Sequence, residues 1–139
     1  MARGLVLFDL DGTLIDTAPD LCGAANRLRL ESGLTPLPYE DLRPFAGTGA
    51  KGLLAKALGV FPDNPRYPEL RACFLSDYSE HMRDNTVPFA GIDAVLQRLA
   101  AEGRHWGIVT NKAMRLAGPL VQDLIAPIAE PDVLIAGDT

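Results

Sequence analysis

Three short, mainly apolar runs, each the length of a single strand, constrain the fold of this chain more than any other feature. They lie at Leu5–Phe8, His105–Thr110 and Asp132–Ala136. An apolar run of this length is typical of a strand buried on both faces, as in a parallel sheet. Helical patterns over residues 92–103 and 113–124 flank the second run. The order strand–helix–strand–helix–strand predicts an α/β fold.

The segment between the first two strands is predicted to be helical. Thr17, as N-cap, with Pro19 and Asp20 in the first turn, begins a helix that should end at Gly33. Further helices are expected over residues 40–43, 50–58 and 69–83, and no strand is expected between residues 15 and 87. We therefore expect residues 15–87 to form an all-helical cap, and residues 1–14 and 88–139 to form an α/β core. The cap would emerge from the carboxyl end of the first strand, the edge where open α/β sheets bind ligands.

Two carboxylates follow the first strand directly. Asp9 and Asp11 stand two residues apart, so in an extended chain their side chains point to the same side. Like charges this close either shift a pKa or require a cation between them, and Mg²⁺ suits hard oxygen ligands. A carboxylate beside Mg²⁺ can attack phosphorus, while a second one protonates the leaving oxygen and then activates water. A turn capped by Asp and Thr side chains is the alternative interpretation.

Neutral donors are expected at the same edge of the sheet. Gly12 permits a tight turn, and its backbone N–H could meet a phosphate oxygen. The second strand ends in Thr110 and Asn111, whose hydroxyl and amide could bind phosphate oxygens without neutralising metal ligands. The alternative interpretation of this Thr-Asn pair at a strand end is that it caps the following helix.

The charge balance and hydropathy exclude several classes of partner. The chain has 13 basic and 18 acidic residues, a net charge of -5, and no cluster of Lys or Arg. Binding to nucleic acid through phosphate neutralisation is therefore not expected. No apolar run approaches the length of a signal peptide core or a membrane span, and Cys22 and Cys73 lie far apart, outside a CxxC spacing. We expect a cytoplasmic protein with no membrane partner; the oligomeric state stays open.

The motifs in this order resemble those of a known family. Asp9–Thr13, followed by Leu-Ile-Asp-Thr, resembles the first motif of the haloacid dehalogenase-like phosphohydrolases, and Val109–Lys112 is similar to their second. Pro88–Gly91 resembles the return into their core domain from a helical cap. The chain looks most like the phosphoglycolate phosphatase-like enzymes, and Trp106–Lys112 also resembles the related N-acetylmuramic acid 6-phosphate phosphatases. The resemblance implies a Rossmann-type parallel sheet with an inserted helical cap, and a Mg²⁺-dependent phosphatase that acts on a small phosphorylated metabolite.

The same resemblance implies a role for each motif residue. Asp9 would be the nucleophile that forms an aspartyl-phosphate, and Asp11 the general acid and base. Mg²⁺ would be held by the Asp9 carboxylate and the Asp11 backbone carbonyl. Thr110 would bind the phosphate, and Asn111 would support that site.

Three further residues are expected to bind substrate. Gly12 and Thr13 belong to the first motif. Lys51 ends the turn Gly47–Lys51, which falls where these enzymes carry a specificity loop. Its ammonium could meet a carboxylate or phosphate of the substrate, and a solvated lysine at a helix start is the alternative.

Two elements of the family's site have no clear counterpart in the sequence. One is a lysine, usually in a Lys-Pro pair, that offsets charge between nucleophile and phosphate; the other is a late acidic motif that completes the Mg²⁺ shell. Lys112 comes too early for that lysine, and Asp138 better resembles the Gly-Asp that precedes the Lys-Pro loop. We therefore expect the chain to be the N-terminal portion of such an enzyme. The alternative to an active phosphatase is a catalytically incomplete fragment.

Overall fold

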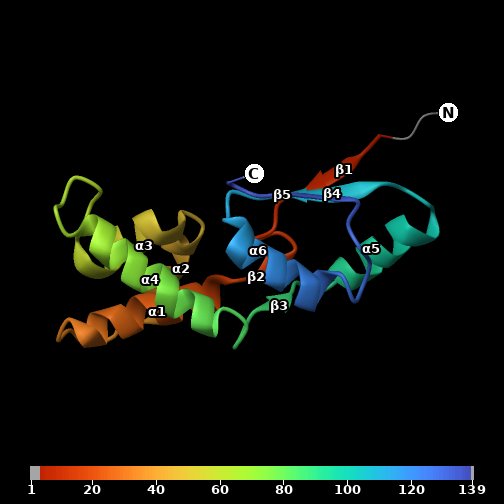
Figure 1. Cartoon of the computed structure of the whole chain (residues 1–139). Coiled ribbons are helices and arrows are strands. Elements are labelled where there is room, and N and C mark those ends of the chain that lie inside the picture. The colour runs from red at the N-terminus through yellow and green to blue at the C-terminus, as the bar shows by residue number, and fades with distance from the viewer. Residues whose placement is uncertain (1–3, 139) are drawn as a thin grey trace. The chain divides into compact units, whose positions relative to one another are not determined.

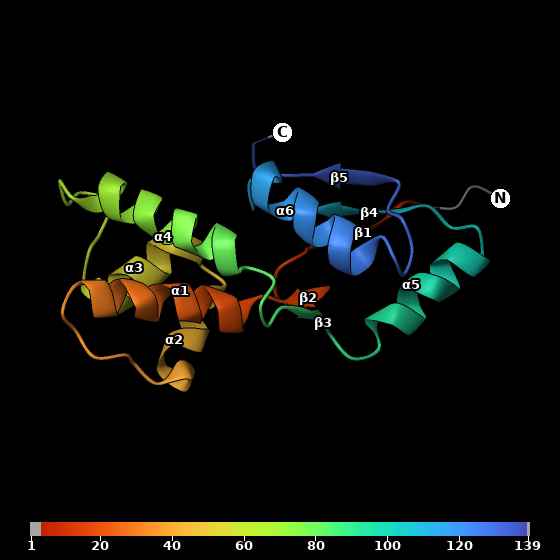
Figure 2. The same ribbon diagram turned by 60° about the horizontal axis from the view of Figure 1, so that its bottom comes forward.

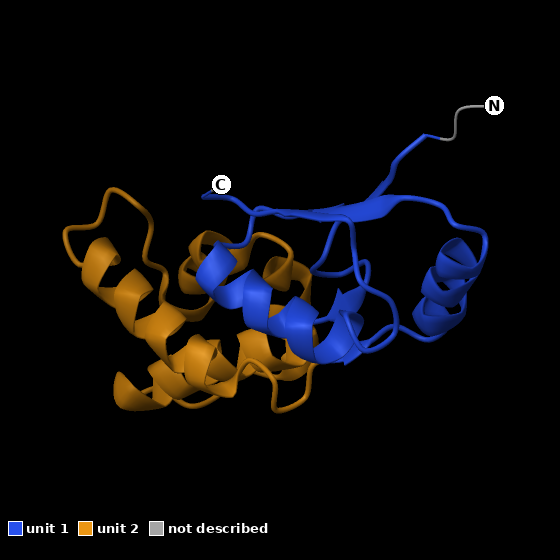
Figure 3. Ribbon diagram, turned by 45° about the vertical axis from the view of Figure 1, so that its right-hand side comes forward, with its two compact units in different colours: residues 1–16, 87–139 blue, residues 17–86 orange. Residues whose placement is uncertain are grey.

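The computed structural model describes residues 4–138 of the chain (Figure 1). The chain separates into two compact units (Figure 3). Unit 1 comprises residues 1–16 and 87–139, and unit 2 comprises residues 17–86. The assignment of unit 1 as a catalytic core and of unit 2 as a cap stays a prediction.

Unit 1 is built on a three-stranded parallel sheet. Its strands β1 (Val6–Phe8), β4 (Trp106–Val109) and β5 (Val133–Ile135) lie in the order β1-β4-β5. β1 pairs with β4 in parallel, with Phe8 opposite Ile108, and β4 pairs with β5 in parallel, with Ile108 opposite Leu134. The α/β fold with a parallel sheet is confirmed.

Three helical segments complete unit 1: α5 (Ile92–Ala101), α6 (Met114–Leu120) and the π-helical turn η1 (Val121–Ile125). The last two together occupy the segment for which the sequence predicted one α-helix. Pro119 lies inside α6 and has no backbone N–H to donate. In the π-helical turn that follows it, the backbone hydrogen bonds widen from i+4 to i+5 spacing.

The two faces of the sheet differ in burial. Trp106 and Ile108, two residues apart in β4, share one face of the sheet and are buried. Both α5 and α6 lie over a single face of this sheet (Figures 1 and 2). Leu7, Val109 and Ile135 lie on the opposite face and are 51%, 41% and 40% exposed. The expectation that the first strand is buried on both faces is therefore wrong, because the described helices of unit 1 cover only one face.

Unit 1 also contains a second, smaller sheet. β2 (Ile15–Asp16) and β3 (Val87–Pro88) pair antiparallel, with Ile15 opposite Pro88. The expectation that residues 15–87 contain no strand is therefore wrong. Each strand has only two residues, too few for an alternation pattern to reveal. The chain enters unit 2 directly after β2 and leaves it directly before β3.

Unit 2 consists of the helices α1 (Ala18–Glu31), α2 (Tyr39–Ala46), α3 (Gly49–Leu58) and α4 (Tyr67–His81). All four lie where the sequence predicts helices, although α2 continues through Pro44. Their apolar faces form the core of the unit, to which α4 contributes Phe74 and Tyr78 with stacked rings. Cys22 is buried in this core, whereas Cys73 is exposed.

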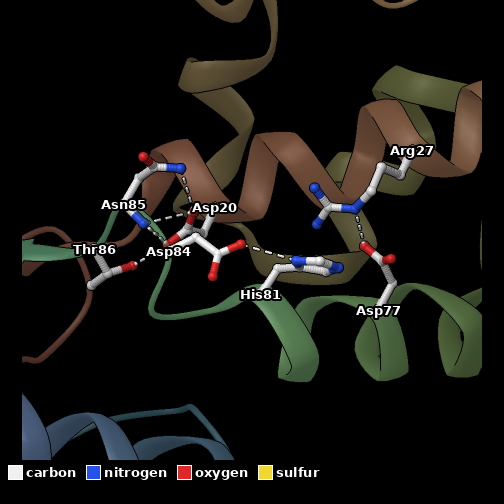
Figure 4. A network of polar contacts seen from close by, with 7 residues as sticks. All are labelled: Asp20, Arg27, Asp77, His81, Asp84, Asn85 and Thr86. Atoms are coloured by element: carbon white, nitrogen blue, oxygen red, sulfur yellow. Dashed lines mark hydrogen bonds and ion pairs between the residues drawn. The ribbon is translucent and has the colours of Figure 1, made fainter.

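A buried carboxylate joins the two ends of unit 2 (Figure 4). Asp20, only 3% exposed, accepts hydrogen bonds from the backbone N–H of Asn85 (2.9 Å), its side-chain amide (3.1 Å) and the Thr86 hydroxyl (2.8 Å). Thr17, the N-cap residue, makes no side-chain capping bond. The start of α1 is therefore held mainly by Asp20 and the segment that leaves the unit.

Among residues 4–138, no helix combines the length and the apolar character required to cross a bilayer.

Replacing Asp20 with Ala is expected to destabilise the protein strongly. The change removes the acceptor of several hydrogen bonds and leaves the buried Thr86 hydroxyl without this partner, so the free energy of unfolding should fall by about 2–4 kcal/mol. Asp63→Ala, at an exposed loop position, is the matched control and should change it by less than about 0.5 kcal/mol. Urea denaturation measures both values, and similar losses in the two variants would contradict this role of Asp20.

The stability of unit 1 should depend on pH through Asp132. The backbone N–H of Trp106 donates to Asp132 (2.9 Å) and holds the pKa of this carboxyl below its ordinary value; His105 acts in the same direction and burial opposes both. A lowered folded-state pKa contributes stability above the unfolded value of about 3.9, and this contribution is lost as the pH falls through the folded value.

Asp132→Asn should therefore cost stability at pH 7 and progressively less as the pH falls below about 3.9. Urea denaturation of both proteins at pH 7 and pH 3 measures the difference. A stability difference of the same size at both pH values would show that the charge of Asp132 contributes nothing.

Candidate active site

The first loop of the candidate site is a tight turn at the carboxyl end of β1. The backbone carbonyl of Leu10 accepts hydrogen bonds from Thr13 (3.3 Å), Leu14 (3.0 Å) and Ile15 (3.2 Å). Leu10 and Leu14 are fully buried and anchor the turn. Gly12 has φ +76°, a left-handed conformation that glycine adopts without strain.

This turn places the two carboxylates in different surroundings. Asp9 is exposed, and one of its carboxylate oxygens, Oδ1, accepts the backbone N–H of Leu10 at 2.7 Å. Asp11 is half-buried, and its Oδ1 lies 2.9 Å from Nζ of Lys112 in an ion pair. The side chain of Lys112 is only 8% exposed. An ammonium group from the loop after β4 therefore reaches a carboxylate in the loop after β1.

Lys112 is the site residue that the sequence-based interpretation missed. Its position along the chain, too early for the family's usual lysine, does not by itself point to the site. The sequence does carry one signal that Lys112 belongs to this site, namely its position just after a predicted strand. In the structure that strand, β4, is adjacent to β1. The carboxyl ends of adjacent parallel strands meet at one edge of the sheet.

The structure assigns the backbone N–H of Gly12 to the turn itself. This N–H donates to the carbonyl of Ile15 at 2.9 Å, so the proposed hydrogen bond to a phosphate oxygen would have to replace an existing one. Thr13 is exposed at the tip of the same turn.

The second loop holds Thr110 in a buried position at the end of β4. Its backbone N–H donates to the carbonyl of Ile135, and its hydroxyl oxygen accepts the backbone N–H of Lys112 at 3.1 Å. A hydroxyl that accepts in this way still has its own proton to donate to an anion. Asn111, next in the chain, is exposed.

The end of β5 fixes this loop from the other side. The N–H of Gly137 donates to the carbonyl of Lys112 (3.0 Å), and the Asp138 carboxylate accepts the N–H of Met114 (2.9 Å). Asp138 therefore binds the first turn of α6, where the sequence left open a cap by Thr110 and Asn111. A Cβ atom at Gly137 would lie only 2.1 Å from the Asn111 carbonyl oxygen, so the close approach requires glycine.

The donor set at this edge fits a partly hydrated Mg²⁺. The described residues contain no group of three or more His, Cys, Asp or Glu side chains that could hold a metal. Mg²⁺, however, commonly binds through one or two carboxylates and completes its shell with waters and phosphate oxygens. The Asp9 carboxylate and the Asp11 carbonyl are suitable ligands of this kind. Lys51 lies in unit 2, exposed in the first turn of α3, and its role stays a prediction.

Comparison with known proteins identifies the family. A model of the haloacid dehalogenase-like hydrolases matches residues 6–124. An N-acetylmuramic acid 6-phosphate phosphatase from Pseudomonas aeruginosa is 40% identical over 119 residues, which are 86% of this chain and 53% of that protein. A phosphoglycolate phosphatase from Caulobacter vibrioides is 36% identical over 143 residues, covering 91% of this chain and 60% of that protein.

The fold agrees with these matches. A crystal structure of a predicted phosphoglycolate phosphatase from Haemophilus somnus superposes with a TM-score of 0.79 at 23% identity, over 96% of this chain and 62% of that one. The chain belongs to the haloacid dehalogenase-like hydrolase family. It spans between half and two thirds of the length of these relatives.

Gly137→Ala is expected to disturb the loop after β4. The new Cβ would overlap the Asn111 carbonyl, and relieving this overlap should cost about 1–3 kcal/mol of unfolding free energy. Gly118→Ala in α6 is the control, because the nearest atom to its new Cβ is 3.8 Å away and alanine favours a helix. Thermal unfolding of both variants measures the difference; a Gly137→Ala protein as stable as Gly118→Ala would contradict the close approach.

Proposed function

We propose that this protein is a cytoplasmic Mg²⁺-dependent phosphatase that hydrolyses a small phosphomonoester through an aspartyl-phosphate on Asp9. One observation carries the proposal: Asp9 and Asp11 follow β1 at the sheet edge where Thr110 ends the adjacent parallel strand β4. Membership of a hydrolase family and relatives named as phosphatases support it. In this proposal unit 1 is the catalytic core and unit 2 the cap.

Each step of the reaction can be written with residues of this edge. An Asp9 carboxylate oxygen forms a bond to phosphorus as the ester oxygen leaves, and Asp11 gives that oxygen a proton. Asp11 then takes a proton from the water that attacks the aspartyl-phosphate, and inorganic phosphate departs. The Thr110 hydroxyl and Asn111 amide donate to phosphate oxygens, with Gly12 and Thr13 beside them. Mg²⁺ would supply positive charge between the Asp9 carboxylate and the phosphate.

The proposed substrate class is a small, phosphoglycolate-like phosphomonoester. Several relatives are named phosphoglycolate phosphatase, including the one from Caulobacter vibrioides. The relative at 40% identity is named for N-acetylmuramic acid 6-phosphate, which makes that sugar phosphate the second candidate. In either case Lys51 of unit 2 is the proposed contact for a substrate carboxylate or phosphate. We propose no nucleic-acid or membrane partner.

Beryllium trifluoride, a mimic of a phosphoryl group on aspartate, tests the nucleophile without requiring turnover. We expect a Mg²⁺-dependent bound signal in the ¹⁹F NMR spectrum of the chain, absent in Asp9→Asn because the amide cannot act as the anionic ligand. Asp93→Asn, at an exposed position of α5, is the control and should keep the signal. A signal that persists in Asp9→Asn would contradict the assignment of Asp9.

Turnover separates an active phosphatase from a catalytically incomplete fragment. The chain is assayed with phosphoglycolate, N-acetylmuramic acid 6-phosphate and p-nitrophenyl phosphate in the presence of Mg²⁺. Asp9→Asn should lower kcat at least about a thousandfold, since the nucleophile is lost. Beryllium trifluoride binding without turnover would favour the incomplete fragment, and neither binding nor turnover would overturn the proposed function.

A further inference from the structure

The ion pair between Lys112 and Asp11 is the feature of this site to which the proposed reaction assigns no task. Nζ of Lys112 lies 2.9 Å from Oδ1 of Asp11, and the two side chains are 8% and 27% exposed. Taking a long cationic side chain out of water is costly unless a partner compensates its charge. The paired carboxylate is the proposed acid and base, so the contact bears directly on the chemistry.

We infer, on the basis of the proposed function, that Lys112 is a positioning residue that holds the Asp11 carboxylate for proton transfer. Oδ1 is engaged by the ammonium, so transfer to the leaving oxygen and from water falls to Oδ2. Lys112 acts through Asp11 and does not contact the substrate, in keeping with its nearly complete burial.

The main chain of Lys112 is fixed on both sides, which makes it suitable for this task. Its N–H donates to the Thr110 hydroxyl oxygen (3.1 Å), and its carbonyl accepts the N–H of Gly137 (3.0 Å). A lysine side chain loses considerable rotamer entropy when it is held. Because the backbone of Lys112 is anchored and its side chain is buried, this entropy is lost when the protein folds. It is not lost again each time a substrate binds.

The backbone of Asp11 is fixed as well, so only its side-chain torsion angles can still change the position of the carboxylate. Asp11 forms a bridge with Ile15 across the turn that follows β1. The ion pair selects one orientation of the carboxylate from those that this backbone allows. A displacement of about 1 Å at a reacting group can cost about a hundredfold in rate. Losing the ammonium should therefore lower kcat and leave substrate binding nearly unchanged.

Lys112→Met tests this inference because it keeps an unbranched side chain of similar length without the charge. We expect kcat to fall about 10- to 100-fold while KM changes less than about threefold. Lys112→Arg, which restores a cation, should recover part of the loss. Lys56→Met, an exposed lysine in α3, is the control and should match the wild type. A rise in KM with unchanged kcat would mean that Lys112 binds substrate directly, and would overturn the inference.

A double-mutant cycle with Asp11→Asn shows whether Lys112 acts through Asp11. If it does, adding Lys112→Met to Asp11→Asn should lower the residual kcat by less than about threefold. Losses that multiply would show that the two residues act independently and would overturn the inference.

The same cycle on melting temperature separates this inference from the proposed function. If the wild-type chain neither binds beryllium trifluoride nor hydrolyses a phosphomonoester, the proposed function fails, but the ion pair can still be measured. The two single variants should then change the melting temperature by amounts that do not add in the double variant. Strict additivity would show that the contact is absent in solution. Lys112→Gln provides a second cycle if the methionine variant does not fold.

Discussion

The parallel pairing of β1 with β4 is the interaction on which the candidate site depends. Phe8 lies opposite Ile108, so the two strands end almost level, and the residues that follow them emerge at one edge of the sheet. Asp9 and Asp11 come from one strand end, and Thr110 and Lys112 from the other. A slip of one residue would reverse which side chains face the buried side of the sheet. The buried Trp106 and Ile108 therefore fix the register that assembles the site.

The edge strand β5 contributes to the site without supplying a reacting group. The Ile135 carbonyl accepts a hydrogen bond from the loop after β4 and the Gly137 N–H donates one to it, while Asp138 holds the start of α6 beyond it. These contacts cross between segments that are distant in the sequence but adjacent in the sheet. The loop that carries Thr110 and Lys112 is thereby fixed at several points, as preorganised polar groups require.

Much of the fold could be predicted because it rests on local patterns. The apolar runs predicted β1, β4 and β5, and helical patterns predicted the helices of both units. The position of Asp9 and Asp11 directly after a strand followed from the same patterns. The burial of the first strand did not, because whether both faces of a sheet are covered depends on neighbouring elements and not on the strand.

The features that sequence reasoning missed are contacts between distant segments. The β2–β3 pair is too short to show a pattern. The sequence places Asp20 in the first turn of a helix, but not beside its hydrogen-bond partners at the far end of unit 2. The position of Lys112 along the chain does not reveal its role either. Its partner, Asp11, stands far away in the sequence and becomes its neighbour only through the pairing of β1 with β4.

Two carboxylates of this chain, Asp20 and Asp11, show how the choice of partner separates a structural role from the chemical role that we propose for Asp11. Asp20 is almost fully buried and accepts only from neutral donors, an arrangement that holds the segment in place and leaves the carboxylate no access to solvent. Asp11 has a single buried cation on one oxygen and remains partly exposed. An acid or base must be held in position and still be reached by its substrate. The proposed role of Lys112 meets both requirements, because its ammonium contacts Oδ1 of Asp11 and would leave Oδ2 for the reaction.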